Sequence, residues 1–155
     1  MLNDNITNKD KVALIKIRTL LKDGVCAKNI DYIHCEDVCL AKYKDIIDGI
    51  MKINYTNKMT MKKTDNNYNF VMELYKQQNY SCETFKWIIP FFMGTIWWVK
   101  LEIYNLEEFI NTYYSDHYFE LAVIDLNNQI VFSIEEDEDY KMDVYLVDMH
   151  CSDEK

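Results

Sequence analysis

Thiol and imidazole groups gather in one short stretch of the chain. The segment "HCEDVC" brings His34, Cys35 and Cys39 together, and Cys26 lies nine residues before Cys35. A structural zinc site needs four nitrogen or sulfur ligands, usually in pairs at short spacing. The second pair is missing here, and Cys39 falls on the apolar side of an expected helix. The sequence therefore predicts buried thiols and a surface histidine, with no metal and no cofactor.

Catalytic groups are present, but no catalytic motif surrounds them. Five cysteines and three histidines allow a Cys–His pair on paper, yet no local signature or strand–turn–helix element exposes a nucleophile. General acid–base work needs a pocket that separates two pKa values, and sequence shows none. The candidate carboxylates are Glu102, Glu107, Glu108, Asp116, Glu120 and Asp125. We expect a non-enzymatic protein, with a small hydrolase using an unrecognised carboxylate or Cys–His site as the alternative.

The acidic run Glu135 to Asp139 is the strongest local signal. Five like charges in a row repel one another, so this segment is poorly suited to a buried ladder. It is predicted to be a hairpin turn between "QIVFSI" and "YKMDVYLV", and turns carried by a rigid sheet often hold binding residues. The predicted partner-binding residues are Glu135, Glu136, Asp137, Glu138, Asp139, Tyr140, Asp143 and Tyr145.

The charge of the whole chain restricts its partners. The formal net charge is −9, from 26 acidic against 17 basic residues. Nucleic-acid binding requires Lys and Arg to neutralise phosphates, so this chain should repel nucleic acids and anionic membranes and attract a basic protein. The longest apolar run, Trp87 to Val99, is interrupted by Pro90 and Gly94 and is too short to span a bilayer. No secretory signal is seen, and a cytoplasmic protein is expected.

The elements that must position these residues follow from periodicity. Apolar residues at helical spacing predict four helices, and a polar, locally basic stretch at 54–67 predicts a long loop. The predicted helices are 9–22, 38–53, 68–78 and 106–114, with Asn66 or Asn67 opening the third and Asn105 capping the fourth. "CAKNIDYIH" is expected to be irregular or a short extended piece.

Strand patterns dominate after Ser81. "TFKWIIPFF" and "TIWWVKLEIY" predict a strand pair, with Pro90 favouring an edge or a bulge. Trp97 and Trp98 should point to opposite faces of the sheet. "HYFELAVIDL", the turn Asn127-Asn128 and "QIVFSIEE" predict a hairpin, which "YKMDVYLVDM" extends.

Together these patterns predict one α+β domain, residues 1–155: N-terminal helices packed on a mostly antiparallel sheet with one inserted short helix. The helical part is expected over 1–80, and the sheet over 81–150 with its helix at 105–115.

The order of elements resembles a known family. "FKWIIP", an aromatic strand, "YNLEEFINTYY" and "YFELAVIDLNNQIVFSIEED" are similar to small bacterial immunity proteins found beside polymorphic toxins, including those of contact-dependent growth inhibition systems. The resemblance covers about Phe85 to Asp148. Family members carry histidines after the last such strand, where this chain has Glu135 to Asp139.

The resemblance implies a cytoplasmic protein that binds one cognate toxin domain and covers its active site or substrate surface. It also implies that this toxin is a basic nuclease, which a charge of −9 would complement. An adaptor protein with an unrelated basic partner is the remaining alternative.

Overall fold

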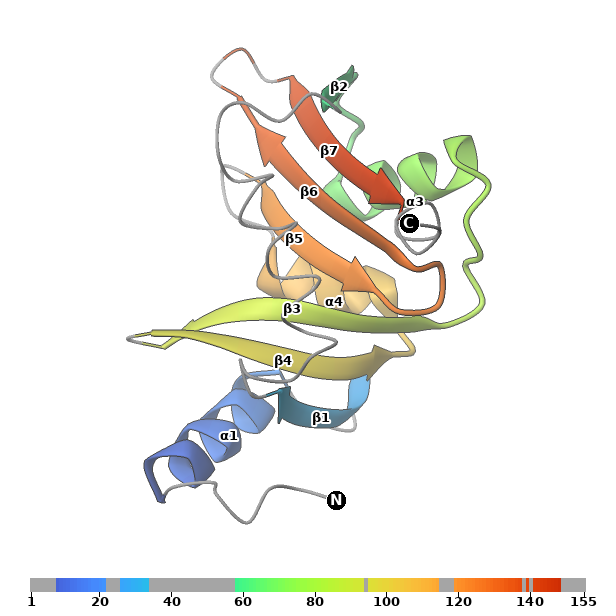
Figure 1. Cartoon of the computed structure of the whole chain (residues 1–155). Coiled ribbons are helices and arrows are strands. Elements are labelled where there is room, and N and C mark those ends of the chain that lie inside the picture. The colour runs from blue at the N-terminus through green and yellow to red at the C-terminus, as the bar shows by residue number, and fades with distance from the viewer. Residues whose placement is uncertain are drawn as a thin grey trace, which may run out of the picture.

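The computed structural model describes residues 8–21, 26–33, 58–93, 95–114, 119–137, 139 and 141–148. Within them, helices accompany one seven-stranded sheet in which all neighbouring strands are antiparallel (Figure 1). The described helices are α1 (Asn8–Leu20), α3 (Asn67–Gln77) and α4 (Leu106–Tyr113). The strands are β1 (Ala27–Ile33), β2 (Lys58–Met61), β3 (Phe85–Met93), β4 (Thr95–Ile103), β5 (Glu120–Asp125), β6 (Ile130–Glu136) and β7 (Met142–Asp148). The predicted α+β class is confirmed.

The strand order is β1-β4-β3-β5-β6-β7-β2. The five interior strands form two hairpin systems, β3–β4 and β5–β6–β7, and the two edge strands come from the part of the chain before α3. The first 80 residues, which were expected to be the helical part, thus also contribute two strands. Of these, β1 lies in "CAKNIDYIH", for which a short extended piece was one of the two alternatives. The predicted helix 38–53 lies outside the described residues.

Strand β2 corrects the prediction of a long loop over 54–67. It pairs with β7 from Lys58↔Tyr145 to Met61↔Met142. Met59 and Met61 alternate with polar residues, and both methionines pack with the core. Four residues of alternation inside a polar, lysine-rich stretch are too short a signal to outweigh its composition.

Helices α3 and α4 begin where asparagine side chains cap them. The Asn66 carboxamide oxygen accepts the Asn69 amide at 2.8 Å, and that of Asn105 accepts the Glu108 amide at 3.1 Å. Each bond satisfies a backbone N–H that the first helical turn leaves without a partner. The sequence analysis predicted both caps.

The β3–β4 hairpin is in register from Phe85↔Ile103 to Met93↔Thr95. On its other side, β3 pairs with β5 at only two positions, Trp87↔Asp125 and Ile88↔Ile124. Pro90 lies beyond both pairs. The predicted edge position or bulge for Pro90 is therefore wrong, because β3 is an interior strand with an uninterrupted register to β4. Pro90 is tolerated there because it lies where a missing N–H breaks no bond to β5.

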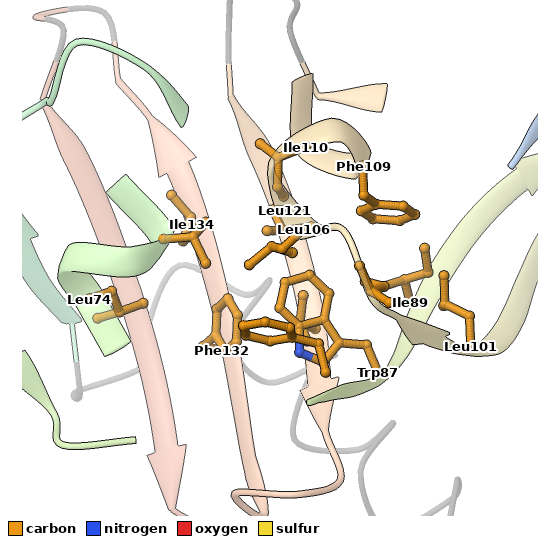
Figure 2. Packing of buried hydrophobic residues seen from close by; sticks show 14 of the residues in the cluster. Leu74, Trp87, Ile89, Leu101, Leu106, Phe109, Ile110, Leu121, Phe132 and Ile134 are labelled. Carbon is orange, nitrogen blue, oxygen red and sulfur yellow. The ribbon is translucent and has the colours of Figure 1, made fainter. Parts of the chain in front are cut away.

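One hydrophobic core fills the space between the helices and one face of the sheet (Figures 1 and 2). Trp87 lies at its centre, edge-to-face with Phe132 and Phe85 at ring-centroid distances of 6.0 and 5.8 Å. Figure 2 shows Leu106 and Phe109 of α4 on the same side as these rings. We call this side the helical face and the other side the second face.

The second face also contains buried apolar residues, which are Ile88, Trp98, Ile124 and Val131. Trp98 alternates with Val99, which belongs to the core on the helical face. Trp98 is thus buried on the second face, whereas the side chain of Trp97 lies outside the described set.

Candidate functional site

The acidic run is divided between a strand and a turn. Strand β6 continues through Glu135 and Glu136, which pair with Asp143 and Met142 of β7. The turn predicted over all five acids is therefore too long at its start, whereas the strand predicted over "QIVFSIEE" correctly includes these two. Alternation of side chains along β6 sends these two carboxylates to opposite faces of the sheet.

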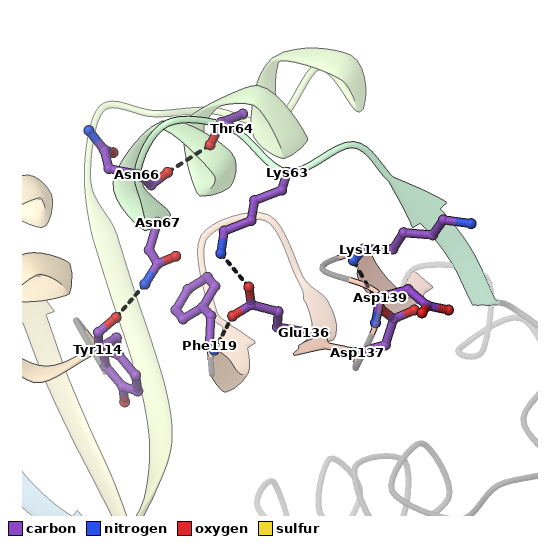
Figure 3. A network of polar contacts seen from close by, with 10 residues as sticks. All are labelled: Lys63, Thr64, Asn66, Asn67, Tyr114, Phe119, Glu136, Asp137, Asp139 and Lys141. Atoms are coloured by element: carbon purple, nitrogen blue, oxygen red, sulfur yellow. Dashed lines mark hydrogen bonds and ion pairs between the residues drawn. The ribbon is translucent and has the colours of Figure 1, made fainter. Parts of the chain in front are cut away.

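Glu136 points to the helical face and is buried, with its side chain only 2% exposed. One carboxylate oxygen accepts from the Lys63 ammonium, and the other accepts the Phe119 amide at 3.1 Å (Figure 3). Burial alone would raise the pKa of Glu136, but the Lys63 and Phe119 hydrogen bonds and the Lys63 charge together lower it. The carboxylate of Glu136, one of the predicted partner contacts, is thus enclosed and paired within the fold, and we do not include it in the surface described below.

Asp137 builds the turn that follows. Its Oδ1 accepts the amides of Asp139 and Lys141, each at 2.9 Å, and its own amide donates to the Lys141 carbonyl (Figure 3). Asp139 is exposed. The predicted contacts Glu138 and Tyr140 lie outside the described residues.

Three carboxylates stand side by side on the second face, and we call them the carboxylate row: Glu120, Glu135 and Asp143. Glu120 is paired in register with Glu135, and Glu135 with Asp143, so the row crosses β5, β6 and β7. At its end, the Thr60 hydroxyl of β2 donates to Asp143 Oδ1 at 3.1 Å. The fold thus brings together two predicted contact residues, Glu135 and Asp143, and one candidate catalytic carboxylate, Glu120.

Tyr145 lies on the same face, two residues along β7 from Asp143, and is half-buried. It is in register with Ser133 of β6 and Lys58 of β2. A depression of about 170 Å³ adjoins the row; its lining includes Glu120, Glu135, Ala122 and Ser133. The row, Tyr145 and this depression form a surface that is acidic at one end and aromatic beside it.

Comparison with protein-family models, with curated proteins and with solved structures found no match for this chain.

Asp125 is the fully buried member of the described carboxylate candidates; Asp116 lies outside the described residues. It accepts from the Tyr75 hydroxyl, from the amides of Asn127 and Asn128, and from the Asn128 side chain. Burial raises the pKa of Tyr75 well above its ordinary value, and the Asp125 charge adds to this. The nearby Trp87 indole N–H lowers the pKa of Tyr75, which partly offsets these two effects. The indole N–H itself forms no hydrogen bond with a described residue. This network ties α3 to the β5–β6 turn and has the character of a structural anchor.

A cleft of about 520 Å³ lies at the end of the sheet where β3 begins and β4 ends. The lining comes from β1, α3, the start of β3 with the segment before it, and the end of β4 with the first turn of α4. Sequence reasoning missed this cleft, because its walls come from four separated stretches of the chain, at 28, 68–72, 82–86 and 102–107, that only the fold brings together. Cys82 is exposed at this cleft. The partial burial of its thiol raises the thiol pKa, and the Asp125 charge adds to this, so the nucleophilic thiolate is disfavoured.

Among the residues that the structure describes, no group of three or more His, Cys, Asp and Glu side chains is arranged to hold a metal ion. The candidate ligands His34, Cys35 and Cys39 lie outside that set, and Cys26 is buried. No described helix has both the length and the apolar character needed to cross a membrane.

Proposed function

We propose that this chain is a non-enzymatic immunity protein that binds a cognate toxin domain, a basic nuclease, and covers its active site or substrate surface. The observation that carries the proposal is the carboxylate row on the second face of the sheet. The complex would form in the cytoplasm, where such a toxin acts.

The row places like charges opposite one another on neighbouring strands. Like charges directly opposite each other on neighbouring strands are unfavourable, whereas opposite charges at such positions contribute roughly 0.2–1 kcal/mol. Here Glu120 opposes Glu135, and Glu135 opposes Asp143. A basic partner that places Lys or Arg over the row would add opposite charges beside these three carboxylates, which makes the row a suitable contact for a cationic surface.

The row is also held on a rigid support. Its residues stand on three paired strands, and beneath them the Lys63–Glu136 ion pair joins the segment before α3 to the end of β6. Preorganised groups lose little conformational freedom on binding. Tyr145 beside the row supplies a large, half-buried aromatic surface of the kind enriched at binding hot spots.

The net charge of −9 extends the effect beyond contact distance. A field of one sign steers an oppositely charged protein during encounter and raises the association rate, most of all at low ionic strength. Fast capture suits an inhibitor that must reach a nuclease before the nuclease reaches its substrate.

The test is affinity purification of the tagged chain from the cells that produce it, followed by mass spectrometry and an activity assay of the captured protein. The proposal expects a basic partner that cleaves RNA or DNA and loses this activity when the chain is added. An acidic partner, or a nuclease that stays active in the complex, would overturn it. A basic partner without nuclease activity would make the chain an adaptor.

A further inference from the structure

The cleft at the end of the sheet is a second surface feature, separate from the carboxylate row. The row lies at the start of β5, whereas the cleft lies at the start of β3, which is beside the end of β5 because the two strands are antiparallel. The two features therefore occupy opposite ends of the central strands.

We propose that this cleft receives an arginine side chain of the basic partner. This rests on the proposed function for the partner's existence, but the chemistry of the cleft argues for arginine by itself. The cleft volume of about 520 Å³ lies in the range of pockets that take small ligands, so it has room for an arginine side chain.

The floor and walls suit the flat, weakly hydrated guanidinium and its methylene stem. Phe85, Ile103 and Leu106 are buried and line the floor. Tyr68 and Tyr104 also line the cleft, and Tyr104 is 52% exposed. Guanidinium groups stack on aromatic rings more readily than ammonium groups do, because they are planar and less strongly hydrated.

The charged residues that line the cleft favour a cation near Glu83 and Glu107. The Lys86 Nζ lies 3.7 Å from Glu102 Oε1, and the Asn29 side-chain amide donates to Glu102 Oε2 at 2.6 Å. The Glu102 carboxylate therefore already has partners within the fold. Glu83 and Glu107 line the cleft as well, and neither forms an ion pair with a described residue.

The Glu83 and Glu107 carboxylates therefore remain to accept bonds from an entering guanidinium. Lys28 is the cation of the rim that has no such ion pair. It is on β1, in register with Glu102. An arginine should accordingly orient away from Lys28, and removal of that charge should strengthen binding.

The experiment uses the isolated full-length chain, so it needs no toxin. N-acetyl-arginine methylamide is titrated into the ¹⁵N-labelled protein and followed by two-dimensional NMR, beside the citrulline analogue, which has nearly the same shape but no charge. We expect saturable shifts at the amides of Tyr104, Leu106 and Glu107, and binding of the citrulline analogue about tenfold weaker or more. Equal binding of both probes, shifts confined to other regions, or no shifts would overturn the proposal.

Variants locate the site. Tyr104→Leu and the double variant Glu83→Gln, Glu107→Gln should each weaken binding of the arginine probe by about threefold to tenfold. Tyr104→Phe, which keeps the ring, and Glu73→Gln, which removes an acid from the edge of a different depression, should leave it unchanged. Lys28→Gln should strengthen it. The NMR spectrum of each variant reports whether the fold is intact, so loss of binding through unfolding is recognised directly.

The two proposals fail separately. Absence of arginine binding overturns the cleft assignment and leaves the carboxylate row untouched. A captured partner that is acidic overturns the proposed function, whereas a measured affinity of the isolated chain for the arginine probe would still stand.

Discussion

Lys63 and Glu136, which are 73 residues apart in the sequence, form an ion pair under the turn between β6 and β7. The lysine side chain is 40% exposed and the glutamate 2%. The pair links the segment after edge strand β2 to the acidic hairpin, and it withdraws one carboxylate of the run from the surface. A stretch that looks uniformly acidic in the sequence thus contains an internal anchor, a turn-forming residue and a surface group.

Replacement of Lys63 by Met should lower the free energy of unfolding by about 1–3 kcal/mol, because it leaves a buried carboxylate without its cation. Urea denaturation measures this. Lys62→Met is the matched control, since Lys62 is exposed and its loss changes the net charge equally. Equal destabilisation by both variants would contradict the anchoring role of Lys63.

Acid should weaken the same anchor. The folded-state pKa of Glu136 lies below its ordinary value. Its stabilising contribution is therefore fully present above the ordinary carboxyl pKa of about 4.3 and is lost as the pH falls through the lower folded value. Urea denaturation of the protein and of Glu136→Gln from pH 7 to pH 3 should show a stability difference that shrinks toward acid. A difference that stays constant with pH would count against the ion pair.

Tyr75→Phe should destabilise the fold by about 1–3 kcal/mol, because the fully buried Asp125 loses one of its donors. Thermal and urea denaturation both report this change. Tyr68→Phe is the control, since Tyr68 is half-buried at the cleft and makes no hydrogen bond through its hydroxyl to a described residue. A loss of stability no larger than that of the control would show that the Asp125 network needs no tyrosine donor.

Local sequence signals predicted most of the elements. The α3 and α4 caps, the β3–β4 pair and the β5–β6–β7 meander each have a strong short-range pattern, such as an asparagine before an apolar helix face or alternation on both sides of a turn. Strand β2 was missed because its two inward methionines are embedded in a polar stretch, and only its pairing with β7 makes it a strand.

The candidate site depended on contacts between distant residues, which local patterns do not contain. Nothing near Glu136 in the sequence indicates Lys63, and nothing near Glu120 indicates Asp143. Their relationships come from strand register, and a shift by one residue would reverse which acids face the solvent. The alternation of side chains along the predicted strand "QIVFSIEE" could have shown that Glu135 and Glu136 take opposite faces of the sheet.

Neutralisation of the carboxylate row should stabilise the isolated protein. The triple variant Glu120→Gln, Glu135→Gln, Asp143→Asn removes like-charge repulsion between neighbouring strands and should raise the free energy of unfolding by about 0.5–1 kcal/mol. Denaturation at low ionic strength gives the clearest reading, because salt screens the repulsion. A loss of stability would mean that the row contributes to the fold rather than opposing it.

The most direct test of the central claim is the association rate of the captured basic partner with this triple variant, measured by stopped-flow fluorescence across a range of ionic strength. The variant Asp65→Asn, Glu73→Gln, Glu108→Gln has the same net charge with the row intact and serves as the control. If the row docks the partner, the row variant should associate about tenfold more slowly than the control at low salt, with the two converging at high salt. Identical rates for the two variants at every salt concentration would contradict the claim that the carboxylate row is the docking surface.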